Sequence, residues 1–120
     1  MNTVIVHKTD VKGSVLDNLA KALPGIIADA LELPDGKLAI VNPKQVSLEF
    51  FQASPRDVGS DIKIMIFARS FSLRTAKKND LAKEILEKIV LLLNKPGEEH
   101  SIDIRLYFMD IGLAEHSPGN

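Results

Sequence analysis

The sequence predicts an α+β domain in which a β-α-β unit occurs twice, giving a four-stranded sheet with two helices on one face. Four short segments alternate apolar and polar residues with the period of two that is typical of strands. Between the first and second, and again between the third and fourth, apolar residues recur every three or four positions, as on a helix. We expect residues 1–120 to form a single domain of this kind.

The four expected strands are rich in β-branched and aromatic residues, which favour the extended backbone. In the third strand, Ile62, Ile64 and Ile66 alternate with more polar or flexible side chains. This alternation predicts that each strand turns one apolar face toward the helices. The strand segments are residues 3–7, 45–51, 61–69 and 101–110.

The first half contains two helix signals separated by a proline. Ser14 is a suitable N-cap for a short helix over residues 15–22. Pro24 favours the start of a second helix, because proline fits a first turn but disrupts a helix interior. We expect this second helix to end at the LPDGK turn of residues 33–37.

The second half contains the strongest helix signal, over Thr75–Leu93. Its apolar residues share one stripe, and its opposite face has Lys and Glu pairs at i,i+4 spacing. Pro96 and Gly97 stop the helix before the last strand, and residues 111–120 form a tail.

The face of the sheet turned away from the helices is predicted to be half apolar. Two helices cover one face only, so this surface would remain exposed in a monomer, and monomers rarely leave a large apolar patch exposed. We therefore expect oligomer formation. The residues assigned to this face are Ile5, Glu49, Phe51, Lys63, Met65, Phe67, Asp103, Arg105, Tyr107 and Met109.

Composition excludes several classes of function. The net charge of −1 gives no global attraction to nucleic acid or anionic membranes, so we expect no nucleic-acid or membrane partner. The absence of cysteine excludes disulfides and thiolate chemistry. No signal peptide or apolar run of membrane-spanning length is seen, and we expect a cytoplasmic protein.

Common catalytic motifs are missing: there is no G-x-S-x-G, P-loop, G-x-G-x-x-G or H-E-x-x-H. The three histidines are scattered without ligand-like spacing, so no metal site and no cofactor are expected.

One basic cluster stands out, FARSFSLRTAKK at residues 67–78. Arg69 ends a strand, and Arg74, Lys77 and Lys78 surround the start of the following helix, where cations oppose the helix dipole. Two arginines beside helix-start N–H groups form a cradle suited to a carboxylate or phosphate. The alternative is an ordinary solvated basic patch, which is the better account of the two lysines.

The amino terminus is a second candidate site. A free α-amino group is a base that titrates close to neutral pH, and a strand beginning at Thr3 would hold it at a fixed point. The alternative is that the sheet simply tethers the terminus.

These residues resemble the tautomerase superfamily, which includes macrophage migration inhibitory factor and 5-carboxymethyl-2-hydroxymuconate isomerase. The resemblance covers nearly the whole chain and lies in pattern more than in identity. It is strongest in the third strand running into the long helix and in the YFMD ending of the last strand. The quoted segments are VIVHKTDV, IKIMIFARSFSLRTAKKNDLAKEILEKIVLLL and IDIRLYFMDIGLAEHSPGN.

The resemblance implies a homotrimer whose sheets line a central barrel, with a site between subunits for a carboxylate-bearing keto or enol acid. It also implies an amino-terminal proline as catalytic base, exposed by removal of the initiator methionine. Here Asn2 stands in that place, so Met1 is expected to be retained and proline-based catalysis is not expected.

The remaining site residues are carried over by position. Lys8 follows the first strand, Arg69 lies where the third strand approaches the site, and Arg105 and Tyr107 fall on the last strand. Arg105 and Tyr107 would equally serve as cross-strand or interface pairs.

Three hypotheses remain open. The first is a tautomerase-like enzyme with an anion pocket, in which Arg69 and Arg74 hold the substrate carboxylate. The second is a non-catalytic trimeric binding or assembly protein of the same fold, and the third is a ferredoxin-like regulatory module, which shares the element order.

Overall fold

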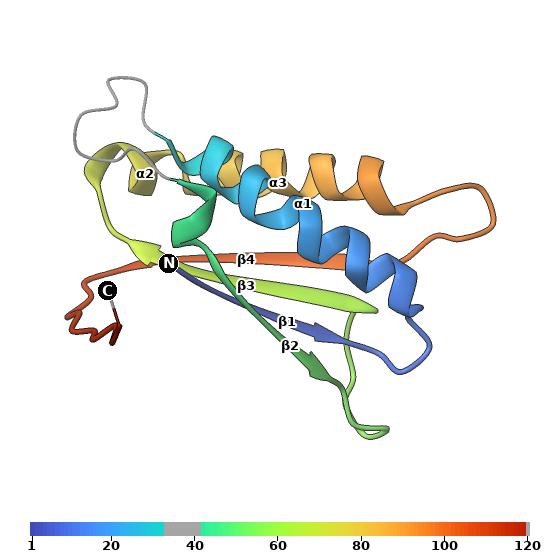
Figure 1. The fold of residues 1–120 in the computed structure, drawn as a ribbon. Coiled ribbons are helices and arrows are strands. Elements are labelled where there is room, and N and C mark those ends of the chain that lie inside the picture. Colours follow the sequence, from blue (N-terminus) through green and yellow to red (C-terminus); the bar gives the residue numbers. More distant parts are fainter. Residues whose placement is uncertain (33–41, 120) are drawn as a thin grey trace.

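The computed structural model describes residues 1–32 and 42–119, and shows one sheet with helices packed on one face (Figure 1). The predicted strands are all present, and the predicted turn at residues 33–37 lies outside the described residues. None of the described helices is long and apolar enough to cross a membrane. The elements are β1 Asn2–His7, α1 Gly13–Leu31, the 3-10 helix η1 Pro43–Gln45, β2 Ser47–Gln52, β3 Ile62–Arg69, α2 Ser72–Ala76, α3 Lys78–Leu93 and β4 Ile102–Met109.

The sheet has the strand order β2-β1-β3-β4. β1 is parallel to β2, β3 is parallel to β4, and the two pairs meet through antiparallel pairing of β1 with β3. This confirms the predicted repeat of two β-α-β units. The strands of each unit are direct neighbours, unlike those of the split β-α-β arrangement of ferredoxin-like modules. The ferredoxin-like alternative is therefore wrong.

The hydrophobic core lies between the sheet and the two long helices, α1 and α3. β3 contributes the most regular face, because every second residue from Ile62 to Ala68 is fully buried. The predicted alternation of β3 is thus confirmed, and so is the helical stripe of the second half. The fully buried residues of α1 and α3 are Leu19, Leu23, Ile27, Leu31, Ile85 and Ile89.

The first helix differs from the prediction because α1 is continuous and contains Pro24 in its interior. Ser14 lies inside this helix, and the N-cap residue Lys12 makes no side-chain cap hydrogen bond. Proline removes one helical hydrogen bond. Nevertheless, the buried residues Leu19, Leu23 and Ile27 continue one stripe across the proline. Burial of this stripe against the sheet outweighs the local preference for a break.

The second helix also differs, since the predicted Thr75–Leu93 helix is two helices. α2 begins three residues earlier, at Ser72, and the backbone leaves helical geometry at Lys77, with φ −108° and ψ 17°. The break separates two different packing requirements. α2 directs Arg74 into the interior, whereas α3 presents the apolar stripe that includes Ile85 and Ile89.

The face of the sheet turned away from the helices, here called the outer face, has none of the described helices over it (Figure 1). The assignment of Ile5 to this face was wrong, because Ile5 is fully buried in the core. Val4 and Val6 take its place, since Val4 is the register partner of Met65 and Val6 that of Phe51. Phe67 and Tyr107 stack on this face, with ring centroids 5.0 Å apart.

Thr3 places a hydroxyl in the core, where Oγ1 has no hydrogen-bond partner among the described residues. A buried hydroxyl without a partner costs roughly 1–3 kcal/mol. We therefore expect Thr3→Val to raise the free energy of unfolding by about 1 kcal/mol in urea denaturation. Thr3→Ser, which keeps the hydroxyl and removes a methyl group, should lower it. A less stable Thr3→Val protein would show that the hydroxyl is satisfied.

Asp61 joins the starts of β3 and β4. Its carboxylate accepts a 3.1 Å hydrogen bond from the backbone N–H of Ser101, and the Ser101 hydroxyl accepts one from the Asp61 N–H at 2.8 Å. The Ser101 N–H, aided by Lys8 at 3.5 Å, holds the pKa of Asp61 below its ordinary value. A carboxyl with a lowered pKa stabilises the fold above its unfolded-state pKa, and this contribution is lost as pH falls through the folded-state pKa.

Asp61→Asn is accordingly expected to reduce stability at pH 7 by about 0.5–1 kcal/mol, the scale usual for a charged group that remains partly exposed to solvent. The difference from the unsubstituted chain should shrink as the pH falls from 5 to 2, because protonation removes the same charge. Urea unfolding at pH 7 and at pH 2 measures this. A difference that is unchanged at pH 2 would contradict the assignment.

Candidate functional site

Antiparallel pairing of β1 with β3 brings together two chain segments that are distant in sequence. Asn2 pairs with Phe67, so Met1 lies beside the last residues of β3. Because β4 is parallel to β3, Met109 pairs with Arg69 at this same edge. The edge formed by the start of β1 and the ends of β3 and β4 is here called the site edge, and the label N marks it in Figure 1.

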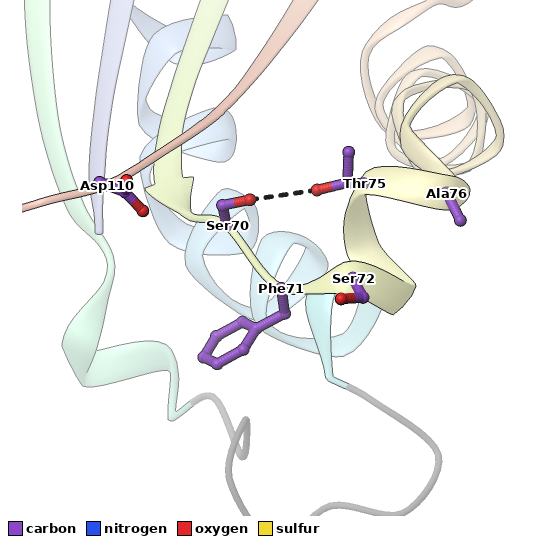
Figure 2. Close-up of a pocket in the computed structure, with 6 residues that line it drawn as sticks. All are labelled: Ser70, Phe71, Ser72, Thr75, Ala76 and Asp110. Carbon is purple, nitrogen blue, oxygen red and sulfur yellow. Dashed lines mark hydrogen bonds between the residues drawn. The ribbon is translucent and has the colours of Figure 1, made fainter.

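A shallow, open hollow lies at the site edge, between the end of β4 and the start of α2 (Figure 2). The Ser70 and Thr75 hydroxyls hydrogen-bond to each other at 3.2 Å, and the Ser70 N–H donates to the Met109 carbonyl at 3.0 Å. The hollow therefore offers hydroxyl groups, one carboxylate and one aromatic ring. Its lining residues are Ser70, Phe71, Ser72, Thr75, Ala76 and Asp110.

None of these lining residues was predicted from the sequence as a site residue. The signal that could have revealed them is the group of hydroxyl side chains in SFSLRT, directly after the strand that ends at Arg69. Among the described residues, no three His, Asp or Glu side chains gather in a way that could hold a metal ion.

Arg69 ends β3 and is exposed. Strand alternation places it on the outer face with Lys63, Met65 and Phe67. No hydrogen bond or ion pair engages its guanidinium within the described part of the chain. Arg69 is thus an available cation at the site edge.

Arg74 is placed differently from the predicted surface cradle, because only 3% of it is exposed. Nε donates to the Leu31 carbonyl at 3.0 Å and Nη1 to the Arg69 carbonyl at 3.2 Å. The guanidinium carbon also lies 4.8 Å from the centroid of the Phe71 ring. Burial lowers the pKa of Arg74 from its ordinary value. Its guanidinium is engaged inside the fold, so in the single chain only Arg69 of the two arginines presents its charge to solvent.

Met1 and Asn2 are held by the start of β2. The Met1 amine donates to the Gln45 carbonyl at 3.2 Å, and the Met1 carbonyl accepts from the Ser47 N–H at 2.9 Å. The Ser47 hydroxyl lies within hydrogen-bond distance of the Asn2 Oδ1, at 3.0 Å. These contacts tether the terminus to the sheet.

Tyr107 and Arg105 both lie on the outer face of β4. Tyr107 is in one row with Phe67 and Asn2, close to the site edge. Arg105 is one row further away, and it donates to both carboxylate oxygens of Asp103, at 3.1 and 3.3 Å. The hydrogen bond to Asp103 raises the pKa of Arg105, and it also occupies the guanidinium fork. Arg105 is therefore paired within its own strand.

Lys8 lies at the opposite end of β1 from Met1. The six residues of β1 separate the two ends by roughly 20 Å, at about 3.3 Å per residue. At that end Lys8 pairs with Asp61, and with Val6 and Lys63 it lines a second hollow under the loop between β2 and β3. Within one chain, the structure brings together Met1, Asn2, Arg69 and Tyr107, but not Lys8.

Comparison with known proteins identifies similar structures but no similar sequences. No model of a protein family matches the sequence, and no curated protein matches it. Solved structures match over nearly the whole chain. A malonate semialdehyde decarboxylase aligns with a TM-score of 0.64 at 14% identity, covering 100% of this chain and 92% of that one.

Two further structures agree. A fused 4-OT, solved as an asymmetric trimer, aligns with a TM-score of 0.67 at 14% identity, covering 98% of this chain and 95% of that one. A macrophage migration inhibitory factor-like protein from Entamoeba histolytica aligns with a TM-score of 0.53 at 13% identity, covering 90% of this chain and 87% of that one. These low identities establish the architecture and not the activity. The chain shares the fold of these structures, which is the fold implied by the resemblance to the tautomerase superfamily.

Proposed function

We propose that this protein is a homotrimer that binds a small carboxylate, a keto or enol acid, in a pocket between subunits at the site edge. The observation that supports this most directly is the register of β1 and β3. That register places the exposed Arg69 guanidinium at one open edge with the amino-terminal end of the chain. An unengaged arginine at such an edge suits bidentate binding of a carboxylate.

The chemistry of the hollow suggests how the ligand would be oriented. The Asp110 carboxylate lines the hollow and would repel the acid group of the ligand. Arg69 is not a lining residue, but it lies next to Ser70 at the end of β3 and would attract the acid group. The acid group is therefore expected on the Arg69 side. The keto or enol oxygen would then face the hydroxyls of Ser70 and Thr75, which can donate or accept hydrogen bonds.

A second subunit would close this shallow site. On the outer face, Phe51 is 52% exposed and Tyr107 and Met109 are each 39% exposed, which favours burial against further copies of the chain. The fused 4-OT structures were solved as trimers, which agrees with such an assembly. In a trimer, Lys8 of one subunit could approach the Arg69 end of the next, which one chain alone does not allow.

Proline-based catalysis is not part of the proposal. Asn2 occupies the position at which the superfamily has its proline, and it is the first residue of β1, with its side chain beside Ser47. The Met1 amine is hydrogen-bonded to the Gln45 carbonyl. These contacts favour the second reading of the fold, a protein that binds its ligand without the usual catalytic amine.

Binding can be tested by calorimetric titration with phenylpyruvate. Arg69→Ala should weaken the affinity by tenfold or more, because a charge-assisted hydrogen bond is worth about 1.5–3 kcal/mol. Arg56→Ala, which removes an exposed arginine from the loop between β2 and β3, is the matched control and should bind normally. Equal affinity of Arg69→Ala and the unsubstituted chain would sink the proposed ligand site. Keto–enol turnover that disappears in Arg69→Ala would overturn the binding-only reading.

Assembly can be tested by sedimentation equilibrium. The unsubstituted chain should sediment as a trimer of 13.2 kDa subunits. Phe51→Asp, on the exposed outer face, should shift it toward monomer, because a charge would be buried without a partner. Leu91→Asp, at a position 84% exposed on α3, is the matched control and should remain trimeric. A monomeric unsubstituted chain would rule out the proposed assembly.

A further inference from the structure

Arg74 is the most deeply buried charged side chain among the described residues, and it connects three parts of the fold. Through Nε it reaches the carbonyl of Leu31, the last residue of α1. Through Nη1 it reaches the carbonyl of Arg69, the last residue of β3. Its planar group also lies over the Phe71 ring. A single guanidinium thus fixes the end of a helix, the end of a strand and an aromatic ring.

Stability alone is a poor explanation for this cation. No carboxylate is paired with it in the described part of the chain. Its partners are carbonyl oxygens, the negative end of the α1 dipole and a ring face. Taking a charge out of water is expensive, and buried polar contacts of this kind often give little net stabilisation compared with a well-packed apolar side chain.

Two of its three contacts border the proposed ligand site. Phe71 lines the hollow at the site edge, and Arg69 supplies the guanidinium expected to bind the carboxylate (Figure 2). A hydrogen bond to the Arg69 carbonyl restrains the backbone from which that side chain extends. Contact with the ring restrains Phe71, two residues further along the chain. Arg74 therefore contacts two neighbouring parts of the proposed site, the backbone of Arg69 and the ring of Phe71.

We propose that Arg74 is a positioning residue, which acts on the ligand only through Arg69 and Phe71. It does not touch the ligand, because its side chain is almost completely buried. This inference rests on the proposed carboxylate site. It predicts a specific requirement for the guanidinium group. Lysine keeps the charge, but its single ammonium group cannot reproduce two fork-like hydrogen bonds and a stacked planar contact.

The test compares Arg74→Met, Arg74→Lys and the matched control Leu93→Ala, which removes a buried side chain at the far end of α3. Each protein is titrated with phenylpyruvate at a temperature at which circular dichroism shows it folded. Backbone amide NMR signals of Ser70 and Phe71 are recorded without ligand. We expect Arg74→Met to weaken binding about tenfold, because a binding group that is moved from its position loses affinity on this scale. It should also shift both amide signals. Arg74→Lys should weaken binding by at least about threefold despite its charge.

Leu93→Ala should lose stability and yet bind with unchanged affinity and unchanged Ser70 and Phe71 signals. If Arg74→Met binds as well as Leu93→Ala does, or if Arg74→Lys restores full affinity, the positioning role is wrong. If the unsubstituted chain does not bind the acid at all, the proposed function fails. The amide signals of Ser70 and Phe71 in Arg74→Met then test separately whether Arg74 positions this segment. Unshifted Ser70 and Phe71 signals in Arg74→Met would then overturn the positioning role, and shifted signals would support it.

Discussion

The antiparallel pairing of β1 with β3 is the contact on which the rest of this fold depends. Each half of the chain is a β-α-β unit with a parallel strand pair, and such units have right-handed crossovers. Joining two of them antiparallel through their first strands relates the halves by an approximate two-fold rotation about an axis normal to the sheet. That rotation keeps both helices on one face and leaves the other face without cover.

Much of this arrangement could be predicted from the sequence, because it follows from local periodicity. The alternation in Ile62–Arg69 specifies which side chains enter the core, and all four predicted strands are present. The predictions failed where packing outweighs local preference. Pro24 signals a helix start, yet a continuous buried stripe holds α1 together through it. Ile5 was placed on the outer face because a five-residue strand that is apolar on both faces does not reveal its own phase.

The candidate site was less predictable, and its two arginines show why. Arg69 and Arg74 are five residues apart in one basic cluster, but strand alternation turns the first outward, while the start of α2 turns the second inward. Charge patterning describes both as surface cations. Only the folded chain shows that the second finds backbone carbonyls to satisfy it, because those carbonyls come from Leu31 and from the end of β3.

The stacked pair of Phe67 and Tyr107 on the outer face has a practical consequence. Tyr107 is the only tyrosine in the chain, and tryptophan is absent. At wavelengths longer than the phenylalanine bands, near-ultraviolet absorption and intrinsic fluorescence therefore originate almost entirely from one phenol ring, which lies on the outer face of the sheet. Without any label, the optical spectrum of this protein reports on a single location, and on whatever comes to lie against it.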